Sequence, residues 1–184
     1  MSLQEPIIIG SDELVSEEDY SQYTLEIGCG QHPTAGYNVS LDIDRDNHPS
    51  VVADANHIPF RDCIFQKICL FEVLEHMSCP MMVLSEVNRV MQFKGFLELS
   101  VPNICHFGDT FLLILGKRIP VTQQHINSWR APELSNLLQR CEFAVVTIDF
   151  MNRVWFNRPS RMIFLFPKRL KCHSLFIRAI KLRK

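Results

Sequence analysis

Two stretches near the start of the chain carry residues whose types and spacing could bind a nucleotide. The first runs from Tyr23 to Gly30 and ends in two glycines, Gly28 and Gly30, that stand behind Glu26. Glycine tolerates positive φ and has no side chain to block a ligand, so this turn could approach a bound group closely. The second, Asn38 to Asp42, is an apolar strand that ends in a carboxylate. In open α/β sheets such a turn meets the ligand's polar end, and the acid on the next strand takes the ribose hydroxyls.

The glycine pair leaves two nucleotide ligands to consider. A dinucleotide turn needs three glycines in the pattern G-x-G-x-x-G, and the third would fall on Pro33. A nicotinamide dehydrogenase is therefore the weakest interpretation. The glycine pair behind Glu26 instead resembles the first motif of class I S-adenosylmethionine-dependent methyltransferases.

Further stretches fall in the order and spacing of the type 11 family of these methyltransferases. They are Leu25–Gly30, Gly36–Asp44, Ala53–Phe60 and Val73–His76. A fifth stretch, Glu86–Gly95, resembles the family's helix that leads into the fifth strand, although Phe93 and Phe96 stand where the family usually shows proline and glycine. Together these stretches cover residues 23–103, and the resemblance implies S-adenosylmethionine as the cofactor.

The resemblance also implies which residues contact that cofactor. The glycine turn would lie under the methionyl part, and Asp42 would accept hydrogen bonds from the ribose hydroxyls. Ile43 would pack on adenine, Asp54 would meet the adenine amino group, and Phe71 would close over the sulfonium side together with Glu72. The cofactor-binding residues expected on this basis are Glu26, Gly28, Cys29, Gly30, Asp42, Ile43, Asp54, Ala55 and Phe71.

Histidines are the candidates for acid–base chemistry. Methyl transfer from a sulfonium is an in-line displacement, so the protein mainly supplies proximity and alignment. An oxygen nucleophile also benefits from a general base of near-neutral pKa, which histidine can provide. We expect His76 and His125 to be catalytic because they fall at or after strand ends on the ligand side; His106 is a further candidate by position.

A metal site is an alternative use of the same residues. Glu72-x-x-Glu75-His76 with the distant His125 resembles the metal set of small-RNA 2′-O-methyltransferases. Two carboxylates and two imidazoles could hold a divalent ion that activates a hydroxyl. The Glu75-His76 pair also occurs widely in the type 11 family without an assigned metal role, so the sequence predicts no metal.

Composition favours one globular domain. The chain has 184 residues, of which 47% are hydrophobic, and a mean hydropathy of +0.03. No apolar run approaches the ~18 residues that span a bilayer, and Met1 opens no signal-peptide pattern. Seven scattered cysteines without a C-x-x-C pair indicate a reduced, cytoplasmic protein.

Charge is distributed unevenly along the chain. All 20 acidic residues lie at or before Asp149, together with 9 basic ones, whereas residues 150–184 hold 10 basic residues and no acidic ones. A basic tail on an acidic body suggests an anionic partner, such as a membrane surface or nucleic acid. The alternative is that the tail packs against the acidic body of its own domain.

The pattern of apolar residues predicts the elements that position these groups. Strands are expected at 23–27, 38–42, 51–55, 67–71, 96–101, 143–150 and 161–166, and helices at 80–92, ended by Gly95, and at 131–141. Residues 107–115 are a candidate substrate-side helix. Only seven residues separate Gly30 from Asn38, too few for a crossover helix, so the first crossover helix is expected to be missing or reduced to a turn.

These observations predict an α/β protein with the Rossmann-like class I methyltransferase fold. Its seven-stranded, mostly parallel sheet would have an antiparallel terminal strand. The expected divisions are a helical extension (1–22), the methyltransferase domain (23–168) and a basic amphipathic helix (169–184), which could contact a membrane.

The expected function is methyl transfer, to oxygen, on a small-molecule, glycan or lipid-linked acceptor. An RNA 2′-O-methyltransferase with a metal site and a non-catalytic cofactor-binding or interaction module remain as alternatives. The sequence leaves the oligomeric state open.

Overall fold

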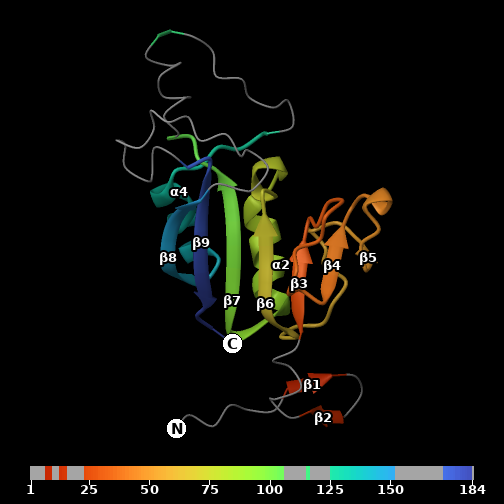
Figure 1. Ribbon diagram of the computed structural model, residues 1–184. Helices are drawn as coiled ribbons and strands as arrows, with labels where there is room; N and C mark the ends of the chain where they lie inside the picture. The colour runs from red at the N-terminus through yellow and green to blue at the C-terminus, as the bar shows by residue number, and fades with distance from the viewer. Residues whose placement is uncertain are drawn as a thin grey trace.

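The computed structural model describes residues 7–9, 13–15, 23–105, 115–116, 125–151 and 172–183. Most of its strands form one seven-stranded sheet (Figure 1). In chain order these strands are β3 (Thr24–Ile27), β4 (Val39–Asp42), β5 (Val51–Val52), β6 (Phe65–Phe71), β7 (Met91–Pro102), β8 (Phe143–Met151) and β9 (Ser174–Lys181). Their order across the sheet is β5-β4-β3-β6-β7-β9-β8, and β9 runs antiparallel to both of its neighbours.

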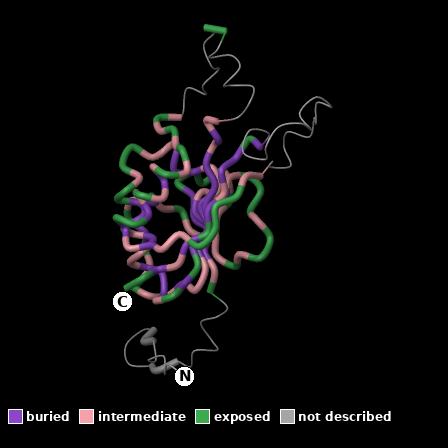
Figure 2. The backbone as a smooth tube through the Cα atoms, turned by 90° about the vertical axis from the view of Figure 1, so that its left-hand side faces the viewer, coloured by how far each residue is buried: buried purple, intermediate pink, exposed green. Residues whose placement is uncertain are grey.

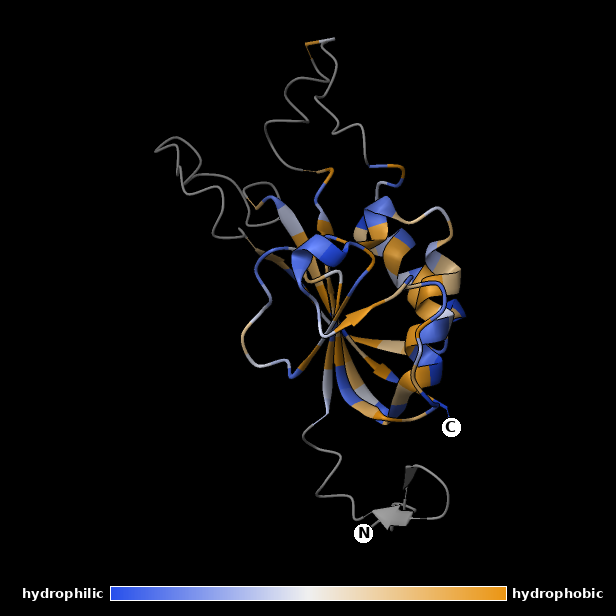
Figure 3. Cartoon of the chain, turned by 90° about the vertical axis from the view of Figure 1, so that its right-hand side faces the viewer, coloured by the Kyte–Doolittle hydropathy of each residue, from blue (hydrophilic) through white to orange (hydrophobic). Residues whose placement is uncertain are grey.

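Both α-helices among the described residues, α2 (Pro80–Val90) and α4 (Ala131–Arg140), cover the same face of the sheet (Figure 3). Apolar residues recur at helical spacing in α2, and Val83, Leu84, Val87 and Val90 are all fully buried. They belong to one core cluster with the inward-facing residues of the central strands, including Ile68, Leu70, Leu97 and Leu99. Figure 2 shows this buried core running through the middle of the molecule.

The other face of the sheet carries a loop where a crossover helix would normally lie. Residues 28–38, all of them described, join β3 to β4 without a helix, as the short spacing predicted. Tyr37 of this loop reaches across the sheet and donates a hydrogen bond of 2.9 Å to Glu98 Oε2 on β7. The loop is therefore attached to the centre of the sheet by a side chain.

Glu98 is the centre of a charged cluster on this face. Lys67 Nζ lies 2.9 Å from its Oε2, and Arg178 Nε donates to its Oε1 at 2.9 Å. Burial raises the pKa of Glu98, but the hydrogen bonds from Lys67, Arg178 and Tyr37 outweigh burial and leave that pKa below its ordinary value. Glu98 is therefore ionised at neutral pH and joins β6, β7, β9 and the loop.

The basic C-terminal helix predicted at 169–184 is wrong where the structure describes this region. Residues Ser174–Lys181 form β9, which lies between β7 and β8. Its residues alternate, with Leu175, Ile177 and Ala179 buried in the core and Arg178 on the open face bound to Glu98. An almost continuous apolar run fits either a helix or a strand, and pairing on both sides selects the strand.

Lys181 at the end of β9 also serves the fold. Its side chain is buried and donates hydrogen bonds to the carbonyl oxygens of Asn88, at 2.7 Å, and Met91, at 2.9 Å. These carbonyls lie at the C-terminal end of α2, where cations are favourable. The three described basic residues of β9 and its extension thus have partners inside the domain, since Arg183 pairs with Glu142.

Three smaller predictions also need correction. Within the predicted N-terminal helix, Glu13–Val15 is strand β2, which pairs with β1 (Ile7–Ile9) in a separate two-stranded sheet. The third strand of the main sheet is only Val51–Val52. Gly95 does not cap α2, because β7 already begins at Met91. Glycine is required there for space instead, since an added Cβ would come within 2.7 Å of Met91 Cγ.

The predicted α/β class and a seven-stranded, mostly parallel sheet with an antiparallel strand near the C-terminus are confirmed. Six of its strands overlap predicted ones, whereas the seventh, β9, lies where a helix was predicted. The strand expected at 161–166 and nearly all of the segment 107–115 lie outside the described residues. None of the helices that the structure describes is long and apolar enough to cross a membrane.

We expect Glu98→Gln to lower the free energy of unfolding by about 2 kcal/mol at pH 7, because two cations lose their charged partner. The pKa of Glu98 is lower in the folded protein than its ordinary value of 4.5. The stabilisation from Glu98 is therefore complete above about pH 4.5 and is lost as the pH falls through the folded-state pKa. The difference between wild type and variant should therefore shrink on acidification in urea titrations. Glu142→Gln is the control, because its partner Arg183 is 76% exposed, and it should cost less than about 0.5 kcal/mol.

Candidate functional site

The glycine turn after β3 lies close to two other segments of the chain, β4 and the residues that follow β6. Gly28 has φ +71°, and its N–H donates to the carbonyl of Leu41 on β4 at 2.8 Å. A Cβ at this position would come within 2.5 Å of Val73 Cγ2. Both the backbone conformation and the space therefore require glycine here.

Two carboxylates hold the loop that follows this turn. Asp42 Oδ2 accepts a hydrogen bond from Gly30 N at 2.9 Å, and Asp42 Oδ1 accepts one from Asp44 N at 2.9 Å. Glu26 binds Thr34 twice, with its oxygens 2.7 Å from Thr34 N and 2.6 Å from Thr34 Oγ1. A carboxylate oxygen has more than one acceptor direction, so Asp42 keeps capacity for ligand hydroxyls.

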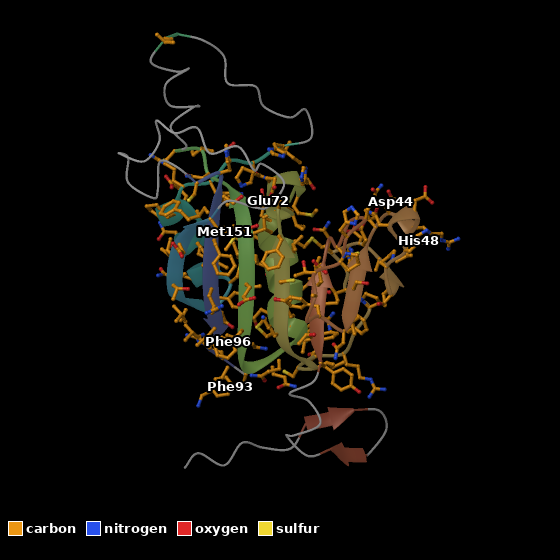
Figure 4. All side chains as sticks on the ribbon, in the orientation of Figure 1. Asp44, His48, Glu72, Phe93, Phe96 and Met151 are labelled. Carbon is orange, nitrogen blue, oxygen red and sulfur yellow. The ribbon has the colours of Figure 1, made fainter. Side chains whose placement is uncertain are left out.

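A cavity of about 220 Å³ opens at the carboxyl ends of the parallel strands. Its walls include six of the nine predicted cofactor residues, namely Gly28, Gly30, Asp42, Ile43, Asp54 and Ala55, together with His76. Figure 4 shows Asp44, next to Ile43, and Glu72 of the cavity wall at this end of the sheet, whereas Phe93 and Phe96 lie at the opposite end. The structure thus brings together most of the residues that the sequence placed in one site.

These walls suit a nucleoside. Asp42 presents a carboxylate where the second parallel strand ends, which is where ribose hydroxyls bind in open α/β sheets. Next to it, the Ile43 side chain is 72% exposed, so a flat apolar ring could cover it. The residues present therefore fit the ribose and the base of S-adenosylmethionine.

Three predicted cofactor residues do not line the cavity. Glu26 is buried, and both of its oxygens are bound to Thr34, so here it holds the loop. Cys29 is buried with Sγ 4.0 Å from Asp42 Oδ2, and burial, followed by the Asp42 charge, raises the pKa of its thiol. Phe71 packs on the open face of the sheet, with its ring centroid 6.4 Å from that of Tyr37. Direct contact between these three and a cofactor stays a prediction.

Glu72 lines the cavity instead of its neighbour Phe71. It has φ +57°, a conformation that is costly for a residue with a side chain. Its Oε1 accepts a hydrogen bond from Ser100 Oγ at 2.7 Å, and its N–H donates to Ser100 O at 3.0 Å. The family resemblance placed Glu72 on the sulfonium side, and its left-handed backbone turns the carboxylate toward the cavity. Val73 and Met77, also in the walls, were not among the predicted cofactor residues.

The loop that carries Asp54 and Ala55 is held by α2. Glu86 Oε2 accepts a hydrogen bond from Ile58 N at 2.9 Å, and Arg89 donates to the carbonyls of Ile58 and Phe60 at 2.9 and 2.8 Å. The hydrogen bond from Arg89 keeps the pKa of Glu86 below its ordinary value. This ion pair therefore fixes one side of the cavity.

The two predicted catalytic histidines lie together. The ring centroids of His76 and His125 are 4.8 Å apart in an edge-to-face arrangement, and His76 lines the cavity. His76 follows β6 in the 3-10 turn η2 (Leu74–His76). Burial lowers the pKa of His125 and nearby His76 lowers it further, while Glu72 opposes them. His125 is therefore neutral at pH 7 and able to accept a proton.

A third side chain joins this pair. Glu75 is buried, and one potential ligand atom from each of Glu75, His76 and His125 lies within 4.8 Å of the others. Glu75 Oε1 is 3.9 Å from His76 Nε2. Carboxylate and imidazole ligands suit several divalent cations, so this group could either move a proton or hold a metal ion.

Comparison with known proteins places most of the chain in one family. The methyltransferase domain family matches residues 10–148. An uncharacterized protein of Methanocaldococcus jannaschii is 31% identical over 110 residues, which are 53% of this chain and 43% of that protein. The chain thus spans less than half the length of this curated relative.

Solved structures share the fold. A possible histamine N-methyltransferase from Thermotoga maritima has a TM-score of 0.66 at 16% identity, over 86% of this chain and 82% of that one. A chain from the complex of the Haloferax volcanii Trm112 methyltransferase activator with a proposed methyltransferase has a TM-score of 0.61 at 14% identity, over 89% and 83%. Such identities establish the fold alone. The match to the methyltransferase domain family covers the resemblance found in residues 23–103 and confirms it, together with S-adenosylmethionine as the cofactor.

We expect Asp42→Asn to weaken binding of S-adenosylhomocysteine about 10- to 100-fold in calorimetric titration, because the charged acceptor of the ribose hydroxyls is lost. Asparagine keeps one oxygen, which can still accept from Gly30 N and hold the glycine turn, and loses only the acceptor of Asp44 N. The control is Asp44→Asn. The wild-type Asp44 carboxylate accepts a hydrogen bond from Asp46 N on the surface, so this variant should bind S-adenosylhomocysteine with an affinity within about twofold of wild type. NAD is the control ligand and should not bind. Equal affinity of Asp42→Asn and wild type would contradict the assignment.

Proposed function

The chain belongs to the methyltransferase domain family, and we propose that it transfers a methyl group from S-adenosylmethionine to a hydroxyl oxygen of a small-molecule, glycan or lipid-linked acceptor. The observation that carries this proposal is the contact of His76, in the cavity wall, with His125. A neutral imidazole beside the cofactor cavity is the group that an alcohol acceptor needs.

The cofactor, when bound, supplies an electrophilic methyl group on a positively charged sulfonium. Asp42 would hold its ribose and the glycine turn would lie under its methionyl part, which would fix the direction in which the acceptor must approach. His125 or His76 accepts the hydroxyl proton as the new carbon–oxygen bond forms and the carbon–sulfur bond breaks. Glu72 and Glu75 then stand beside the resulting imidazolium and stabilise its charge.

The charges around the cavity favour a small acceptor over RNA. Asp42, Asp54 and Glu72 line it, and Glu75 is buried next to His76. Carboxylates repel the phosphates of a nucleic acid, whereas nucleic-acid sites are lined by lysine and arginine. In the C-terminal region, the described basic side chains Arg178, Lys181 and Arg183 are engaged within the domain. They therefore lend no support to the membrane or nucleic-acid contact expected from the sequence.

We expect His125→Asn and His76→Asn to lower kcat 10²- to 10⁴-fold while S-adenosylhomocysteine affinity stays within about twofold, because they remove the proton acceptor and leave the nucleoside contacts. The measurement is S-adenosylhomocysteine formation with a panel of phenol, sugar and lipid-linked alcohols. His48→Asn is the control: His48 is exposed, lies near the β5 edge of the sheet (Figure 4), and has φ +51°, which asparagine tolerates. Cofactor binding without turnover on any acceptor would favour a non-catalytic binding module.

The grouping of Glu75, His76 and His125 supports a second candidate, a metal-assisted 2′-O-methyltransferase that acts on RNA. A divalent ion held by these residues would lower the pKa of the acceptor hydroxyl. This candidate predicts that chelator abolishes transfer to a short RNA, that Mn²⁺ or Mg²⁺ restores it, and that Glu75→Gln no longer responds. Activity that is unchanged by chelator would exclude it and leave the imidazole base.

A further inference from the structure

A short segment of the chain is attached to the turn that carries His76. Ile126 N and Asn127 N both donate to the carbonyl of Glu75, at 2.9 and 3.1 Å. The Asn127 side chain adds two further contacts, because Nδ2 lies 2.6 Å from Met77 O and 3.5 Å from Leu74 O. Residues 126 and 127 thus contact three carbonyls of the turn formed by residues 74–77.

The chemistry of asparagine suits this position. A carboxamide has two N–H donors, so one side chain can reach two backbone carbonyls at the end of a 3-10 turn. Leu74 O also accepts from Met77 N at 3.3 Å within the turn. The Asn127 side chain is partly buried, whereas the neighbouring Ile126 is 64% exposed. Polar contact, rather than apolar burial, therefore fastens the segment here.

This attachment determines where His125 lies. His76 is in η2 after β6, whereas His125 precedes α4, so no shared helix or strand places the two rings together. His125 is nevertheless directly followed by the two residues that bind the turn, and its ring lies 4.8 Å from that of His76. These hydrogen bonds join the segment to the turn formed by residues 74–77, next to the contact between the two rings.

We propose that Asn127 is a positioning residue: its carboxamide holds the segment against residues 74–77 and so sets the His125 ring against His76 at the cavity. The proposal rests on the proposed function in that the histidine pair is taken as the acceptor side of the site. Asn127 is not among the residues that line the cavity, so it would act through His125.

The test uses Asn127→Asp, which keeps the shape of the side chain but removes both N–H donors and places a charge against two carbonyls. In NMR spectra of the full chain, with S-adenosylhomocysteine bound, the cross-relaxation between the His76 and His125 ring protons should be lost and the His125 ring signals should shift. S-adenosylhomocysteine affinity should stay within about twofold. On an accepted alcohol, kcat should fall 10- to 100-fold.

The control is Asn88→Asp, which removes an equivalent carboxamide bond, from Asn88 Nδ2 to Cys141 O at 3.0 Å, between α2 and the end of α4. It should lower the melting temperature without moving the His125 signals. Equal shifts in both variants, unchanged His125 signals in Asn127→Asp, or a wild type without cross-relaxation between the rings would overturn the proposal. If the rings respond as expected but no alcohol is methylated, the positioning role stands and the proposed function fails.

Discussion

The structure depends on three buried carboxylates that hold the loop between β3 and β4. This loop replaces a crossover helix, so most of its N–H groups cannot find partners within a helix and need other acceptors. Glu26 binds Thr34, Asp42 binds Gly30, and Glu98 binds Tyr37. Hydrogen bonds to ionised oxygens are stronger than those between neutral groups. They keep the glycine turn under the cavity although no helix supports it.

The central strands position the other side of the cavity. Ser100 on β7 binds Glu72 through both its hydroxyl and its carbonyl, and this contact maintains a backbone conformation that is costly outside glycine. The chain then enters η2, where Glu75 and His76 lie, and residues 126 and 127 attach to the same turn. The acceptor side is thus built from three parts of the chain around one short turn.

The charges serve the fold as well as the site. Carboxylates gather near the cavity, where they suit a cationic sulfonium, while Arg178 and Lys181 lie along β9 with partners on β7 and α2. The uneven charge of the sequence is therefore partly neutralised inside the domain. Of the two explanations that the sequence allowed for its basic end, internal pairing holds for the basic residues that are described.

The sequence by itself determined those features that depend on neighbouring residues. The glycine turn, the acid at the end of β4 and the helix near residues 80–90 follow from local backbone preferences and apolar periodicity, and all were predicted close to their observed places. The missing crossover helix followed from chain length alone, because seven residues cannot form it.

Only the tertiary structure decided features that join distant residues. The run Leu175–Ala179 is apolar enough for a helix or a strand, and hydrogen bonding to β7 and β8 made it a strand. Glu26 became a loop anchor because Thr34 folds back onto it, and Phe71 turned away from the cavity because strand residues alternate between faces. The Glu98–Arg178 ion pair spans 80 residues. Such contacts depend on the arrangement of the whole sheet, which no stretch of sequence encodes locally.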